Sequence, residues 1–161
     1  MPRQLIPANT LFSMRGRVAI SDGMQQPCFQ ARGEFALFSP TWRLYQGQVL
    51  VGKLLSLRPH WDISPGEERF ALRGSLLSWR RHYRVVSGRW HGAQVTGSLL
   101  DRSFRIEQLG QLLADAKVRW LGLVDAQQVQ VHVDDEACEP FVAMAMLMVQ
   151  LARQQERGRA Q

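Results

Sequence analysis

The C-terminal apolar stretch is the feature that most limits how this chain can fold. Residues 141–152 read Phe-Val-Ala-Met-Ala-Met-Leu-Met-Val-Gln-Leu-Ala, and Gln150 is the only polar residue among them. As a helix, this segment is apolar on every face, so every face has to be buried. Its length of about 18 Å is too short to cross a bilayer, which needs roughly 20 apolar residues. We therefore predict a buried helix that the rest of the chain surrounds.

Acidic residues mark the start of this helix. Asp134, Asp135 and Glu136 come shortly before it, and Pro140 falls in its first turn. Carboxylates are favourable at the positive end of a helix, and proline lacks only an N–H group that would have no partner there. The sequence predicts a helix over residues 137–154, followed by a C-terminal tail over residues 155–161.

The chain before the helix has an apolar pattern with a period of two. Residues 128–133 alternate Gln-Val-Gln-Val-His-Val, which places three valines on one face of a strand. Four turn signals separate such runs, at residues 21–23, 46–48, 64–66 and 87–88. The pattern predicts short antiparallel strands over residues 10–136. Residues 1–9 contain two prolines and no periodic pattern, and we expect them to form an N-terminal tail.

A unit repeats along this region, in which a glycine is followed seven to nine residues later by an aromatic–charged–aliphatic triplet. The triplets are Trp42-Arg43-Leu44, Trp61-Asp62-Ile63, Tyr83-Arg84-Val85 and Phe104-Arg105-Ile106. Each unit is interpreted as a strand that opens on glycine, a bend, and a second strand whose charge faces outward. We expect Trp42, Trp61 and Trp120 to face inward and pack against the helix, and Met144, Met146 and Met148 of the helix to fill gaps in the core. Repeated hairpins favour a sheet that closes on itself, so we predict one domain: a closed antiparallel barrel around the helix.

A family resemblance agrees with this prediction. The run Gly52-Lys-Leu-Leu-Ser-Leu-Arg-Pro59 after two short strands, together with the apolar C-terminal helix, resembles the LURP-one-related family, as a bacterial-type member. The structural kin of that family are the phospholipid scramblases and the C-terminal domain of tubby proteins. The resemblance spans roughly residues 10–152 and implies a barrel of about twelve strands around a central hydrophobic helix.

The same resemblance implies binding rather than catalysis. Tubby domains bind phosphoinositide head groups through basic residues on the barrel surface. Scramblases are associated with calcium and with acylated cysteines, but this sequence has no cysteine-rich stretch, and residues 134–136 lack the spacing of a calcium loop. We therefore expect no metal ion and no cofactor.

The charge of the chain favours an acidic partner, and it is unevenly distributed. Lys and Arg number 20 against 14 Asp and Glu, a net charge of +6. Residues 69–105 contain eight arginines and one acid, whereas residues 106–139 contain seven acids and two cations. Arginine forks match phosphate geometry, so we predict an anion or head-group site in the basic segment. The predicted anion cluster consists of Arg80, Arg81, Arg84 and Arg105, with Lys53 and Arg58 on a neighbouring unit. The alternative is that these charges only keep outward strand positions soluble.

The sequence offers no catalytic motif. Its four histidines show no metal-ligand spacing, and it contains no nucleophile elbow, P-loop or dinucleotide fingerprint. Cys28 and Cys138 lie far apart and outside any metal-binding pattern, which favours two reduced thiols in a cytosolic protein. We expect a protein that is not an enzyme.

Three hypotheses for function follow. The first is a binding module for an anionic phospholipid head group or another phosphorylated ligand, in a cytoplasmic protein at the membrane periphery without a transmembrane segment. The second is a protein-interaction or self-association scaffold that uses the oppositely charged segments. The third is nucleic-acid binding, an unlikely partner because only the net charge supports it.

Overall fold

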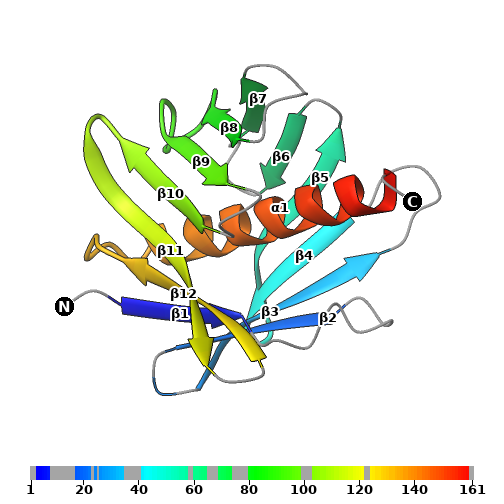
Figure 1. The fold of residues 1–161 in the computed structure, drawn as a ribbon, viewed down its shortest axis with the longest axis vertical. Helices are drawn as coiled ribbons and strands as arrows, with labels where there is room; N and C mark the ends of the chain where they lie inside the picture. Colours follow the sequence, from blue (N-terminus) through cyan, green and yellow to red (C-terminus); the bar gives the residue numbers. More distant parts are fainter. Residues whose placement is uncertain are drawn as a thin grey trace.

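The computed structural model consists of strands followed by one helix (Figure 1). It describes residues 3–7, 17–22, 24, 26–34, 41–57, 60–64, 69–73, 80–98, 103–121 and 124–159. The strands are β1 (Arg3–Pro7), β2 (Arg17–Asp22), β3 (Pro27–Glu34), β4 (Thr41–Gln46), β5 (Val49–Leu57), β6 (His60–Ser64), β7 (Arg69–Arg73), β8 (Arg80–Val85), β9 (Gln94–Ser98), β10 (Ser103–Gln108), β11 (Gln111–Leu121) and β12 (Val124–Val131). The helix α1 covers Cys138–Arg159. Only the backbone is described for β6, for β7 and for α1 beyond Val149.

The strands pair in sequence order. Each one is antiparallel to the strands before and after it, and β1 pairs with both β2 and β12, so the order of pairing closes on itself. We call this arrangement the strand ring. In Figure 1, α1 crosses the middle of the molecule, with β6, β9 and β10 on one side and β1, β4 and β12 on the other.

The two ends of the strand ring are defined by its connections. Successive connections of an antiparallel ring lie at opposite ends, so every second connection is at the same end. The connections β2–β3, β4–β5, β8–β9 and β10–β11 therefore share one end with the start of α1, which we call the proximal end. The opposite end, at which β3 and β11 finish, is the distal end.

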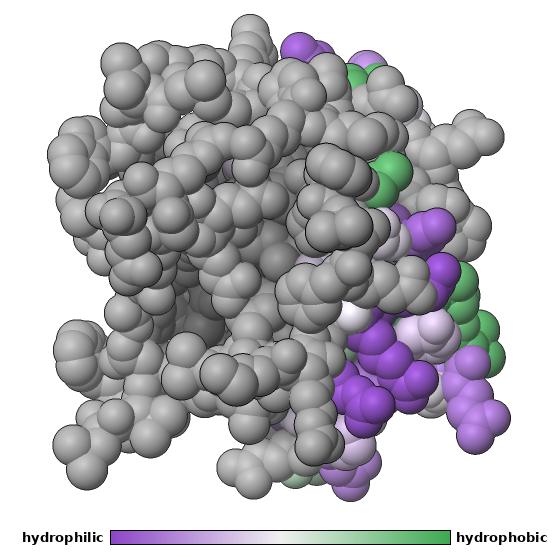
Figure 2. All heavy atoms as spheres, turned by 90° about the vertical axis from the view of Figure 1, so that its right-hand side faces the viewer, coloured by the Kyte–Doolittle hydropathy of each residue, from purple (hydrophilic) through white to green (hydrophobic). Residues whose placement is uncertain are grey.

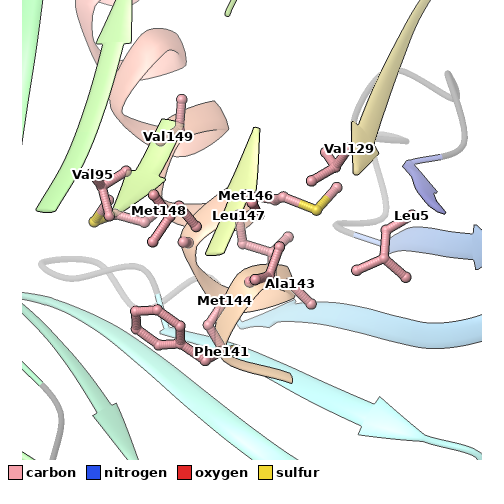
Figure 3. Close-up of a cluster of buried hydrophobic side chains, with 14 of the residues drawn as sticks. Leu5, Val95, Val129, Phe141, Ala143, Met144, Met146, Leu147, Met148 and Val149 are labelled. Atoms are coloured by element: carbon pink, nitrogen blue, oxygen red, sulfur yellow. The ribbon is translucent and has the colours of Figure 1, made fainter. Parts of the chain in front are cut away.

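The core is built around α1. Nine consecutive residues, Phe141–Val149, are buried, so the helix is covered on all its faces along this stretch. Side chains from distant strands meet it there, including Leu5, Val95 and Val129 (Figure 3). The predicted buried helix is confirmed, and so is the expectation that the three methionines fill the core.

Two strand glycines lie where a large side chain meets the backbone. Gly33 is opposite Trp42 in the β3–β4 register, and a Cβ atom at Gly33 would lie 2.9 Å from the indole ring. At Gly52, in the middle of β5, a Cβ atom would lie 2.9 Å from Sδ of Met144 on α1. The prediction that strands open on these glycines is therefore wrong. They occupy positions at which any side chain would collide with the core.

Both ends of the chain differ from the predicted boundaries. Residues 3–7, expected to be a tail, form β1, and Leu5 belongs to the core with 2% of its surface exposed. Five residues are too few to show a periodic pattern, and Pro7 is tolerated because only β2 pairs with it, as at the edge of a sheet. The helix extends to Arg159 instead of residue 154, because Arg, Gln and Glu continue a helix well although they end the apolar pattern.

Most of the coarse predictions hold. The chain is mainly β with one C-terminal helix, and the four turn signals fall where β2, β4, β6 and β8 end. Trp42 is buried as expected, whereas the side chains of Trp61 and Trp120 lie outside the described residues. Cys28 and Cys138 are free thiols.

Candidate functional site

Four cations lie side by side on the outer face of four adjacent strands. The register pairs Arg17 with Arg32, Arg32 with Arg43, and Arg43 with Lys53. We call these four residues, on β2, β3, β4 and β5, the cation row. Adjacent strands are 4.7–4.9 Å apart, so the row spans about 14 Å. The spacing of these four residues along the sequence does not indicate that they lie in one row.

The row faces outward because its neighbours along the strands face inward. Ala31, Trp42, Leu44 and Leu54 alternate with the cations and are all buried. Arg17 and Arg32 are exposed, whereas Arg43 and Lys53 are half-buried. Figure 2 views the molecule from the side toward which β3 points, and hydrophilic residues gather on the described part of this face.

The side chain of Arg32 is held in place by its surroundings. Its Nη2 atom donates a hydrogen bond of 3.0 Å to Oε1 of Gln30, and its guanidinium carbon lies 5.0 Å from the centre of the Tyr45 ring. A cation over an aromatic face is attracted to the ring while its other N–H groups stay available. None of the ion pairs between described side chains involves Arg17, Arg32 or Lys53. These three charges therefore face the surface without a described carboxylate.

The structure spreads the predicted anion cluster over several strands. Arg80 and Arg81 begin β8 at the distal end, where only their backbone is described. Arg84 lies farther along β8, half-buried and opposite Gln94 of β9. Arg58 lies outside the described residues. Lys53 is not brought to the residues of β8, because β6 and β7 lie between, and it belongs to the cation row instead.

Arg105 lies among acids. Its Nη2 atom is 2.8 Å from Oε1 of Glu107 on the same strand, and the register places it opposite Asp115 of β11. Asp115 in turn lies 2.5 Å from Nε2 of His132, just beyond β12. The acidic segment of the sequence thus lies next to the basic one at β10–β11 and offsets part of its charge.

Sequence reasoning missed Arg17, Arg32 and Arg43 as site residues. The triplet Trp42-Arg43-Leu44 did predict an outward Arg43, but nothing in the sequence shows which charges lie beside it. That information is in the pairing register, since a shift by one residue would turn a whole strand to the other face. The row could have been found by aligning neighbouring strands on their inward residues Ala31, Trp42 and Leu54, because the outward cations then fall beside one another.

The start of α1 forms a second group of contacts, at the proximal end. Asp135 accepts a hydrogen bond from the Ala137 amide at 3.0 Å through Oδ1, and its Oδ2 lies 2.6 Å from Nη2 of Arg89. The neighbouring Trp90 stacks on Phe141 of α1, with ring centroids 5.0 Å apart. These contacts attach the β8–β9 connection to the start of the helix, which agrees with the predicted capping role of the acids.

Neither thiol is activated. Burial raises the pKa of Cys138 to about 11, and the nearby carboxylates of Asp135 and Glu139 act in the same direction. Burial, with Asp22 and Glu139, also raises the pKa of Cys28. A thiol with a raised pKa stays protonated at neutral pH and is a poor nucleophile.

The described part of the chain contains neither a cluster of metal-binding side chains nor a helix that could span a membrane. No three of its His, Cys, Asp and Glu side chains are grouped as metal ligands would be. None of its helices combines the length and apolarity required to span a membrane.

The comparison with solved structures shows the fold. The chain is similar to a protein from Arabidopsis thaliana whose structure was determined by X-ray crystallography, with a TM-score of 0.61 and 17% sequence identity. The match covers 92% of this chain and 91% of the Arabidopsis chain, so it includes the strands and the helix together. Neither a family model nor a curated protein matches the sequence.

Proposed function

We propose that this protein is a non-enzymatic binding module that holds anionic phospholipid head groups on the cation row. The observation that carries the proposal is the register of Arg17, Arg32, Arg43 and Lys53 across four adjacent strands. We infer that the strand ring with its buried helix is the barrel of the LURP-one-related and tubby-like proteins. The continuous burial of Phe141–Val149 and the double pairing of β1 support that assignment.

The chemistry of the row suits phosphate. Arginine presents a rigid fork of N–H donors that matches two phosphate oxygens at once, and lysine adds a compact point charge. A row of about 14 Å is longer than one phosphate group needs. It fits a ligand with several phosphates, or a membrane surface that presents many head groups. Gln30 and Tyr45, beside Arg32, add polar and aromatic contacts at its border.

Arg17 and Arg32, the exposed pair within the row, repel each other when no anion is bound. Like charges directly opposite each other on neighbouring strands destabilise a sheet. The usual reason for outward charges, protection of an exposed sheet edge, does not apply to β2, β3, β4 and β5, because each pairs on both sides. A phosphate bound between Arg17 and Arg32 would relieve this repulsion, and this supports an anion site on the row.

Vesicle co-sedimentation tests the proposal. The full chain is mixed with neutral phosphatidylcholine vesicles and with vesicles that also contain an anionic lipid, at low salt and at about 0.15 M ionic strength. We expect binding only to the anionic vesicles, and weaker binding at the higher salt. The variant Arg17→Gln/Arg32→Gln should lose most of it.

The control is Arg84→Gln/Arg105→Gln, which removes the same charge from β8 and β10. If this control loses binding while the row variant keeps it, the site is the predicted anion cluster and the cation row is wrong. Tripolyphosphate added as a competitor separates two sources of phosphate. If it binds to the row while no vesicle sediments the protein, the ligand is a free phosphorylated molecule and the membrane proposal fails.

A further inference from the structure

The proximal end carries the exposed apolar residues of the molecule. All five large hydrophobic residues that are exposed among the described residues lie in or next to proximal connections. They are Met24, Val49, Leu50, Val86 and Leu109. Met24 follows β2, Val49 and Leu50 open β5, Val86 follows β8, and Leu109 follows β10. Because these residues share one end of the strand ring instead of being spread over it, this end is where we look for a contact with another molecule.

Leu109 is the most pronounced case. It is 97% exposed and has a φ angle of 50°, in the left-handed region that branched side chains rarely adopt. Asparagine or glycine would suit this Leu-Gly turn better, both in backbone conformation and in solubility. The turn is also held in place, since Nε2 of Gln108 donates a 3.1 Å hydrogen bond to the His91 carbonyl. A strained, solvent-facing leucine on a fixed turn points to a contact with another molecule.

The charge of the proximal end indicates what covers it. Acids lie at the same end: Asp22 ends β2, Asp134, Asp135 and Glu136 lie between β12 and α1, and Glu139 is in the first turn of α1. In the described connections of this end, Arg89 is the one arginine or lysine, and Asp135 already pairs with it. An anionic lipid surface would be repelled here, whereas a basic surface would be attracted.

The same chain holds a basic surface toward its other end. Arg17 begins β2 and Arg32 lies two residues before the end of β3, so this part of the cation row is near the distal end. We propose that the proximal end of one molecule docks on the cation row of a second copy, in a head-to-tail contact. Because the two surfaces differ, the contact is heterologous, and repeating it builds either a closed ring or an open chain.

This proposal goes beyond lipid binding and predicts competition with it, because both use the cation row. Sedimentation velocity of the full chain over a range of protein concentrations tests it without any lipid. We expect species larger than a monomer at high concentration, and a shift toward monomer as salt increases. A monomer at every concentration would overturn the proposal while leaving lipid binding untouched.

Two variants remove one surface each. Met24→Gln/Leu109→Asn alters the two most exposed apolar side chains, and Arg17→Glu/Arg32→Glu reverses charge on the row. Each change is at an exposed position, and an unchanged or raised thermal midpoint shows that the variant folds. Each variant alone should associate at least about tenfold more weakly than the unmodified chain.

Mixing the two variants gives the decisive result. The row variant keeps its proximal end and the turn variant keeps its row, so an equal mixture should form dimers that neither variant forms alone. A symmetric contact between two proximal ends would not be restored by mixing, and that outcome contradicts the head-to-tail arrangement. If the turn variant instead loses vesicle binding and associates normally, the proximal turns contact lipid and the proposal is wrong.

Discussion

Replacement of Gly33 by alanine adds one methyl group to the core and tests the close contact inferred between Gly33 and the Trp42 ring. The new Cβ would lie 2.9 Å from the Cε2 and Cζ2 atoms of Trp42, closer than non-bonded carbons approach. The indole is rigid and 2% exposed, so it cannot swing away into solvent. Either the ring or the β3–β4 pair has to move. Overpacking of this kind costs about 1–3 kcal/mol, which lowers the midpoint of thermal unfolding by roughly 2–12 °C in a domain of this size.

Gly97→Ala is the matched control. Gly97 also lies in a strand, β9, but a Cβ there would meet the Ser103 carbonyl oxygen at 3.7 Å and the Cβ of Phe104 at 3.8 Å, which are ordinary contacts. Alanine at such a position reduces the freedom of the unfolded chain, so the variant should unfold within about 1 kcal/mol of the unmodified protein. Gly52→Ala should fall between the two, since the flexible Met144 can give way in part.

Urea unfolding measures the three variants on one scale. The midpoint should fall in the order Gly97→Ala, Gly52→Ala, Gly33→Ala, with an unchanged slope. The double variant Gly33→Ala/Trp42→Phe should lose less stability than the sum of its single changes, because the smaller ring leaves space for the new methyl group. Equal midpoints for Gly33→Ala and Gly97→Ala would refute the inferred contact between Gly33 and Trp42.

Three further predictions concern the proximal end. Asp135→Ala should destabilise the protein by about 0.5–2 kcal/mol because it removes the bond to the Ala137 amide, and Arg89→Gln should cost less than about 1 kcal/mol; equal losses in urea unfolding would contradict the capping role. The folded-state pKa of Cys138, about 11, is above its ordinary 9.0, so the unfolded chain ionises first as pH rises. The neutral thiol therefore contributes its full stabilisation below pH 9, and this contribution is lost as the pH rises toward 11. Over that interval the urea midpoint of the unmodified protein should fall relative to that of Cys138→Ala. A difference between the two midpoints that does not change with pH would refute this prediction. Leu109→Asn should leave the thermal midpoint unchanged or raise it, since asparagine adopts a positive φ more readily, and a lower midpoint would show that Leu109 packs within its own molecule.

The helix and its surroundings could be predicted because their signal is local. An apolar segment of this length without a polar face has few alternatives, and Phe141–Val149 is indeed buried throughout. The alternation in residues 128–133 likewise predicted Val129 and Val131 as core residues. The short β1 escaped prediction, because five residues do not establish a period and its stability depends on the strands beside it, β2 and β12.

The candidate site was missed, because its members are adjacent only through strand pairing. Arg17 and Lys53 belong to strands that are distant in sequence, and each intervening pair has its own register. The β4–β5 pair even shifts register between Leu44 and Tyr45, an irregularity that no propensity encodes. The basic composition suggested an anionic partner. The densest run of arginines along the chain, which contains Arg80, Arg81 and Arg84, was therefore chosen as the site, and the cation row was overlooked.

The groups of like charge in the structure differ from those along the sequence. Along the chain, a basic segment over residues 69–105 precedes an acidic one over residues 106–139. An antiparallel ring places the ends of such segments side by side, as Arg105 and Asp115 show, and their fields cancel locally. The ring instead brings together residues that lie at the same end of it, the last residues of one strand and the first residues of the next. The cation row and the acids of the proximal end therefore arise from position within each strand, and not from the order of charged segments along the chain. If the row binds lipid as we propose, the proximal turns, among them the one that carries Leu109, stay exposed for contact with another molecule.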